Sequence, residues 1–87
     1  MIYSVQFTPQ ALEDLSRLDV PIAGRIAAKI QWFAEHFDQI QAETLTGTFA
    51  SQFKLRVGDW RVIYATDPAL HTITIHVIAH RSKVYKS

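Results

Sequence analysis

The chain has no cysteine, only three glycines and three prolines, and a net charge of only +1 over 87 residues. Without cysteine it can form neither a disulfide nor a thiolate zinc site, which suits a reducing compartment. No apolar run approaches the roughly 20 residues that a membrane-spanning helix needs. The opening segment MIYSVQFTPQ lacks the charged start and apolar stretch of a signal peptide. These absences predict a soluble cytoplasmic protein without a membrane partner.

The residues that are present predict a single folded domain over 1–87. Hydrophobic residues make up 48% of the chain, which is typical of a globule and not of a disordered tail. The small net charge hides an uneven distribution. Residues 1–47 hold three cations against six carboxylates, whereas residues 48–87 hold six cations against two. This polarity indicates an anion site in the C-terminal half.

The N-terminal half predicts a strand followed by two helices. Residues 2–7 alternate as a strand does, and Thr8 with Pro9 forms a helix start, with Thr8 as the N-cap. A first helix is expected over 10–18, and Pro21 ends it before a second helix over 21–37. Gly24 in the second helix suggests close packing of the helices. The apolar stripe expected on the second helix consists of Ile22, Ile26, Ile30, Phe33 and Phe37.

The C-terminal half predicts three strands, near 50–57, 60–66 and 72–80, after a polar loop over 38–48. The expected order is therefore β-α-α-β-β-β. This is an α+β fold in which an N-terminal strand and a helical hairpin precede a three-stranded antiparallel meander, with the helices laid over an antiparallel sheet.

Two residues, Gly58 and Asp59, separate the first two of these strands, which is the signature of a tight hairpin turn. Counting outward from this turn fixes the register, and alternate pairs share a face of the sheet. The predicted core face consists of Phe53, Leu55, Val57, Trp60, Val62 and Tyr64. The opposite, charged face consists of Lys54, Arg56, Arg61 and Ile63. If the last strand alternates in the same way, its residues divide into Ile73, Ile75, Val77 and Ala79 on the core face and His76, Ile78 and His80 on the charged face.

Like charges directly across an antiparallel pair are destabilising. The predicted register nevertheless puts Arg56 opposite Arg61, with Lys54 beside them. This cluster is either a solvated face whose side chains splay into water or an anion site. The hairpin face holds no carboxylate that could neutralise the cluster, which favours the anion site, with phosphate as the expected ligand.

Further candidates lie near the C-terminus. His80 could transfer a proton or simply end a strand at the surface. Tyr85 could stack on an unpaired base or pack on the sheet as an apolar contact. The four histidines are scattered without carboxylate partners, so no metal site and no cofactor are expected.

The segment LTGTFASQFKLRVGDWRVIYATD, followed by ITIHVIAHRSKVYK, resembles the RelE/ParE superfamily of type II toxin–antitoxin toxins, and its RelE-like branch in particular. The resemblance spans nearly the whole chain and implies the RelE-like microbial RNase fold. It also implies an endoribonuclease that cuts mRNA in the ribosomal A site. In that reaction the ribose 2′-OH attacks the adjacent phosphate without a metal, which inhibits translation and leaves a 2′,3′-cyclic phosphate.

The resemblance implies a role for each matching residue. Lys54 lies near the attacking hydroxyl, Arg61 stabilises the phosphate in the transition state, and Arg81 acts near the leaving oxygen. Tyr85 orients a base, and His80 assists proton transfer. The residues expected to bind RNA are Arg56, Lys83 and Lys86.

The resemblance further implies a cognate antitoxin of RelB type or similar, which neutralises the toxin in a hetero-oligomer, with the ribosome and its mRNA as the other partners. Two alternatives remain open. One is a ParE-like inhibitor of DNA gyrase, and the other is a catalytically weak homologue that acts as a binding module.

Overall fold

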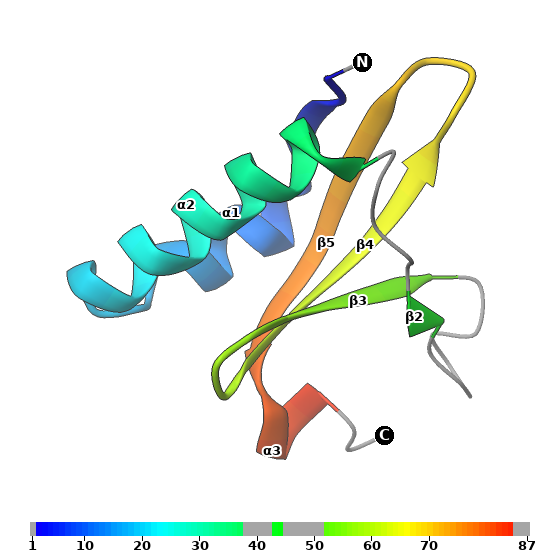
Figure 1. Ribbon diagram of the computed structural model, residues 1–87. Coiled ribbons are helices and arrows are strands. Elements are labelled where there is room, and N and C mark those ends of the chain that lie inside the picture. Colours follow the sequence, from blue (N-terminus) through cyan, green and yellow to red (C-terminus); the bar gives the residue numbers. More distant parts are fainter. Residues whose placement is uncertain (1, 38–42, 45–51, 85–87) are drawn as a thin grey trace.

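The computed structural model describes residues 2–37, 43–44 and 52–84. Its elements follow the predicted order with two short additions, β2 and α3 (Figure 1). The elements are β1 (Ser4–Phe7), α1 (Pro9–Ser16), α2 (Val20–Glu35), β2 (Glu43–Thr44), β3 (Phe53–Val57), β4 (Trp60–Asp67), β5 (Thr72–His80) and α3 (Arg81–Val84). The predicted α+β class is confirmed.

The sheet has five strands in the order β1-β5-β4-β3-β2. β1 runs parallel to β5, while the other neighbours are antiparallel, so the prediction of an antiparallel sheet is wrong for the first strand. Strand composition carries no information about direction, which explains the error. β2 lies within the predicted loop 38–48, whose remaining residues fall outside the described part of the chain. No helix in the described ranges is long and apolar enough to cross a membrane.

The two main helices begin where the sequence predicts. Thr8 caps α1 by accepting a hydrogen bond from the backbone N–H of Ala11 at 3.1 Å, and Pro9 occupies the first turn. The predicted apolar stripe of α2 is confirmed, since its members are buried or pack against the core. Gly24 is different, because a Cβ built there would meet nothing within 4 Å. The predicted close packing at Gly24 is therefore wrong.

The core lies between the helices and one face of the sheet (Figure 1). Tyr64 of β4 is at its centre, with its ring 5.0 Å from that of Phe33 and 5.7 Å from that of Phe53. Trp60 packs against the same cluster, so the predicted packing roles of Trp60 and Tyr64 are confirmed. Other fully enclosed members of this core are Ile26, Val62, Ile73 and Ile75.

The hairpin of β3 and β4 has the predicted register. Arg56 pairs with Arg61 and Lys54 with Ile63 across the two strands. Gly58 opens the turn with φ +60°, a conformation that costs glycine little and strains other residues. Leu55, Val57 and Val62 belong to the core, and the charged residues therefore occupy the opposite face.

A β-bulge changes the faces of the last strand. Ile63 pairs with Val77 and Tyr64 with Ile75, which leaves His76 as an extra residue in β5. Before the bulge, the predicted core positions Ile73 and Ile75 are confirmed.

After the bulge the alternation is reversed. Ile78 is buried in the main core, whereas Val77 and Ala79 pack on Ile63 at the other face of the sheet. His80 pairs with Trp60 and so leaves the charged face. The predicted faces of these four β5 residues are wrong because one inserted residue shifts the period-two pattern.

Side chains of α1 and its N-cap hold the bulge. Asp14 accepts a hydrogen bond from the backbone N–H of Ile78 at 3.0 Å, and Thr8 donates one to the carbonyl of His76 at 3.2 Å. These contacts satisfy backbone groups that the irregular ladder leaves unpaired. The bulge is thus stabilised by the helix layer.

The Asp14→Ala substitution should therefore destabilise the fold. It leaves the partly buried N–H of Ile78 without its acceptor, and we expect the free energy of unfolding to fall by about 1–3 kcal/mol. Urea denaturation measures the change. The control is Glu13→Ala, which removes an exposed ion pair with Arg17 and should cost less than about 1 kcal/mol. Equal effects of the two substitutions would contradict the bracing role of Asp14.

Candidate functional site

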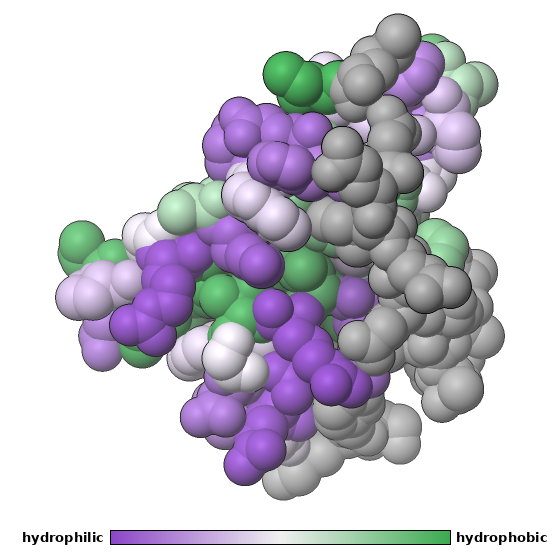
Figure 2. Space-filling view, viewed as in Figure 1, coloured by the Kyte–Doolittle hydropathy of each residue, from purple (hydrophilic) through white to green (hydrophobic). Residues whose placement is uncertain are grey.

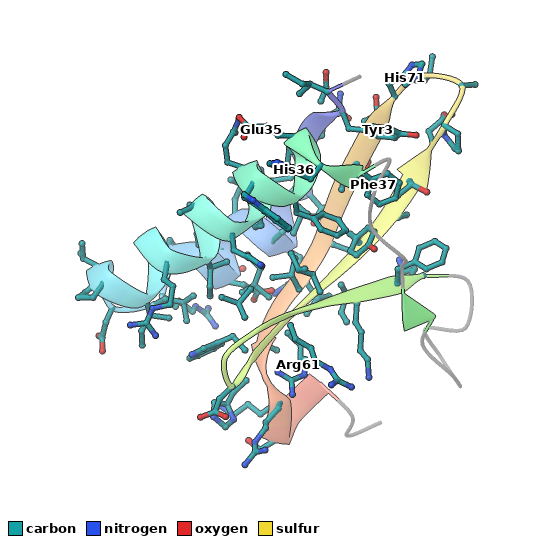
Figure 3. All side chains as sticks on the ribbon, in the orientation of Figure 1. Tyr3, Glu35, His36, Phe37, Arg61 and His71 are labelled. Carbon is teal, nitrogen blue, oxygen red and sulfur yellow. The ribbon has the colours of Figure 1, made fainter. Side chains whose placement is uncertain are left out.

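Arg61 lies at the centre of the charged face, beside the β3–β4 turn and α3 (Figure 3). Its Nη1 donates to the carbonyl oxygens of Gly58 and Trp60, each at 2.9 Å. Two backbone acceptors therefore hold the guanidinium against the turn. This anchoring fixes the direction of the side chain before any ligand arrives, which lowers the entropy cost of binding.

The Nε of Arg61 is buried and has no hydrogen-bond partner among the described residues. A buried donor without an acceptor costs about 1–3 kcal/mol, so an acceptor supplied by a ligand would relieve this cost. Because Nη1 is bonded to the turn, Nε and Nη2 form the edge whose two N–H groups match two oxygens of a phosphate. The geometry suits a bound anion.

Two further cations share this face. Arg56 is exposed opposite Arg61, and Lys54 is half-buried opposite Ile63. Figure 2 shows hydrophilic residues gathered over the β3–β4 turn and α3, below an apolar centre between α2 and β3. The predicted grouping of Lys54, Arg56 and Arg61 on one face of the hairpin is confirmed.

Arg81 joins this region through Asp59. The backbone N–H of Arg81 donates to the carbonyl of Asp59 at 2.8 Å, and its Nε lies 3.7 Å from Oδ1 of the same residue. The turn therefore holds both arginines: Gly58 and Trp60 bind Arg61, and Asp59 binds Arg81. Asp59 was not among the site residues predicted from the sequence. Only the register of β4 and β5 reveals that the C-terminal end of β5 lies beside the β3–β4 turn.

His80 lies in a different environment from the one predicted. Its ring meets Trp60 edge-on at 5.4 Å, and its Nδ1 lies 2.9 Å from Oγ of Ser82. The backbone N–H of Ser82 also donates to Nδ1 at 3.2 Å, so this nitrogen must be an acceptor. In this arrangement His80 ties the start of α3 to the end of β5.

The structure describes only one of the three remaining predicted residues. Lys83 is exposed on α3, while Tyr85 and Lys86 lie outside the described residues. No group of three histidine, aspartate or glutamate residues within 2–37, 43–44 and 52–84 could hold a metal ion. The short β2 places the backbone of Glu43 opposite Lys54, a pairing that the predicted loop did not include.

The family model for the "ParE toxin of type II toxin-antitoxin system, parDE" matches residues 5–85. The chain belongs to this family. It is accordingly a toxin of a type II toxin–antitoxin system, and the resemblance to the RelE/ParE superfamily is confirmed. No curated protein gives a significant sequence match.

Solved structures show the same fold. The toxin–antitoxin complex RelBE2 of Mycobacterium tuberculosis contains a chain 25% identical, with a TM-score of 0.78, over 93% of this chain and 100% of that one. The RelE–RelB complex of Pyrococcus horikoshii gives 22% identity and a TM-score of 0.74, over 97% and 100%. The isolated RelE toxin of E. coli gives 21% and 0.74, over 95% and 90%. The RelE-like fold is thus confirmed.

Proposed function

We propose that this toxin is a metal-independent endoribonuclease that cleaves mRNA in the ribosomal A site and so inhibits translation. The observation that carries the proposal is the anchored Arg61, whose buried Nε lacks an acceptor among the described residues, on a face shared with Lys54 and Arg56. A phosphate between these cations would accept from Arg61 and relieve the repulsion between the strands.

The cleavage step needs an aligned 2′-OH and stabilisation of the charge that develops on the phosphoryl oxygens. Arg61 serves the phosphoryl oxygens, and Lys54, on the same face, serves the attacking hydroxyl. Arg81 stabilises charge on the leaving oxygen from α3, where Asp59 holds it. Because the guanidinium group of an arginine stays protonated in proteins, charge stabilisation suits it better than proton donation.

Five other residues complete the proposal. Arg56, Lys83 and Lys86 bind the RNA backbone, and Tyr85 orients a base by stacking. We assign His80 a positioning role at the start of α3, because its ring packs against Trp60 and its Nδ1 is hydrogen-bonded to Ser82.

The chemistry of the cut ends tests the proposed reaction. Translated mRNA incubated with the toxin should give fragments whose 3′ ends resist polyadenylation until a phosphatase that opens cyclic phosphates is added. Attack by the 2′-OH breaks the bond to the 5′ oxygen and leaves this end, whereas attack by water that displaces the 3′ oxygen leaves a free 3′-hydroxyl and a 5′-phosphate on the downstream fragment. Fragments with free 3′-hydroxyl ends would rule out the proposed step.

Asp59→Asn should reduce the cleavage rate by up to about fivefold. It keeps the backbone acceptor for Arg81 and removes only an exposed ion pair, a change of less than about 1 kcal/mol. Arg81→Ala should have the larger effect because it removes the cation itself. Single-turnover cleavage of ribosome-bound mRNA compares the two variants. If Asp59→Asn lowered the cleavage rate as much as Arg81→Ala, Asp59 would contribute more to cleavage than an exposed ion pair can.

DNA gyrase inhibition is the second candidate function, and the match to the ParE toxin model favours it. Under this alternative the charged face would serve for docking, and no RNA would be cut. Purified toxin would then inhibit gyrase supercoiling and leave translated mRNA intact.

We also propose a cognate antitoxin as the physiological partner, forming a hetero-oligomer with the toxin in the cytoplasm. Three of the similar structures are toxin–antitoxin complexes with RelB, from P. horikoshii, Methanococcus jannaschii and E. coli. An antitoxin that covers the charged face would block the phosphate site directly.

A further inference from the structure

One exposed face of α2 presents basic and aromatic side chains in a row. Its members, called here the α2 stripe, are Arg25, Lys29, Trp32 and His36. Spacings of four, three and four residues place them on one side of the helix, beside the buried stripe. No carboxylate falls on this row. Trp32 is 44% exposed, although tryptophan side chains are highly buried on average.

The three C-terminal members of the stripe contact one another. The Lys29 ammonium lies 4.2 Å from the ring centroid of Trp32, within the range of a cation–π interaction. The ring of His36 stacks on Trp32 at 4.5 Å and 21°, and its Nδ1 lies 2.8 Å from the Trp32 carbonyl. Figure 3 shows His36 at the C-terminal end of α2. These contacts keep the indole and its cation in a defined arrangement at the surface.

The stripe itself carries two cations, although the N-terminal half is acidic in sequence. Within the described ranges the carboxylates of both helices have partners of their own. Glu13 pairs with Arg17, Glu35 with Gln31, and Asp14 with the backbone of β5. No carboxylate in those ranges pairs with the cations of the stripe. The stripe therefore presents two cations that have no ion-pair partner in the described ranges, beside an exposed aromatic ring.

We propose that the α2 stripe is a second RNA-binding surface, separate from the charged face of the sheet. Arg25 and Lys29, one helical turn or about 6 Å apart, bind neighbouring phosphates, while the exposed edge of Trp32 packs against a sugar or base. Aromatic and basic residues in one row match RNA better than an acidic peptide, which needs cations alone. The stripe would hold the toxin on structured RNA while the scissile phosphate lies at Arg61.

The inference rests on the proposed function only in taking RNA as the partner, and binding can be measured without cleavage. All variants carry Arg61→Ala, which removes the proposed activity. Fluorescence anisotropy of a labelled RNA hairpin gives the affinity as a function of salt. We expect Lys29→Glu to weaken binding about five- to tenfold and to lower the salt slope by about 1.

Arg17→Glu is the matched control, with the same charge change on the exposed C-cap residue of α1, which already has a partner. It should change the affinity less than twofold. Equal losses for the two variants would overturn the proposal, because they would reflect net charge alone. Circular dichroism confirms that each variant is folded.

The fluorescence of Trp32 gives a direct readout of contact. In the Trp60→Phe background Trp32 is the only tryptophan, and RNA should change its emission at the concentrations that raise the anisotropy. RNA binding without a change at Trp32 would refute a contact with the stripe. A change in Trp32 emission on adding polyglutamate, without one on adding RNA, would instead assign the stripe to an acidic protein partner. Failure of mRNA cleavage, with these binding results intact, would overturn only the proposed function.

Discussion

Arg61→Ala should reduce the rate of mRNA cleavage on the ribosome by about 10²–10³-fold, as expected when a preorganised donor to a developing anion is removed. The side chain is held by Gly58 and Trp60, and its Nε lies buried and without an acceptor in the described part of the chain. Its loss takes away both the charge and the fixed direction of the donor. Single-turnover cleavage of a ribosome-bound message measures the effect.

Stability should not fall in parallel. Removing Arg61 loses its two hydrogen bonds to the turn, but it also relieves like-charge repulsion with Arg56 and eliminates a buried unpaired donor. These effects oppose one another, so the free energy of unfolding should change little. Arg61→Lys is the informative control. It keeps the charge but loses the planar fork, so it should restore only a minor part of the rate. Full activity of the lysine variant would contradict the fork geometry assigned to the site.

Phe33→Ala should have the largest effect on stability. Phe33 is 2% exposed and contacts the rings of Phe37 and Tyr64, at the point where α2 covers the sheet. Truncating a buried phenylalanine costs about 3–5 kcal/mol. A domain of this size has a total stability of about 4–13 kcal/mol, so much of the margin would be lost. We expect the melting temperature to fall by at least about 12 °C.

Leu12→Ala on α1 is the control for this prediction. Leu12 is 54% exposed, and its truncation should change the melting temperature by only a few degrees. Thermal unfolding followed by circular dichroism compares both variants. A small effect of Phe33→Ala would show that the aromatic cluster is not the centre of the core.

The β3–β4 hairpin could be predicted residue by residue because Gly58 and Asp59 leave a single register for a two-residue turn. The apolar stripe of α2 was equally readable, since its helical period admits one buried face. The hairpin register alone is enough to place Lys54, Arg56 and Arg61 on one face of the sheet.

The extent of the last strand was predicted, but the faces of its residues after the bulge could not be, because a bulge has no signature in composition. His76 is an ordinary strand residue in the sequence, and only contacts with Thr8 and Asp14, far away in the chain, stabilise its extra position. The same holds for Asp59, whose role depends on the end of β5 reaching the turn. Local patterns give faces and turns, whereas long-range contacts decide where the periodicity breaks.

Primer extension on a message translated in a reconstituted system is the decisive test of ribosome-dependent mRNA cleavage. The same RNA incubated without ribosomes and a gyrase supercoiling assay are run in parallel. We expect cuts within A-site codons that require ribosomes and disappear in the Arg61→Ala variant, while supercoiling by gyrase is unchanged. Intact mRNA together with inhibited supercoiling would contradict ribosome-dependent cleavage and establish the gyrase-directed alternative.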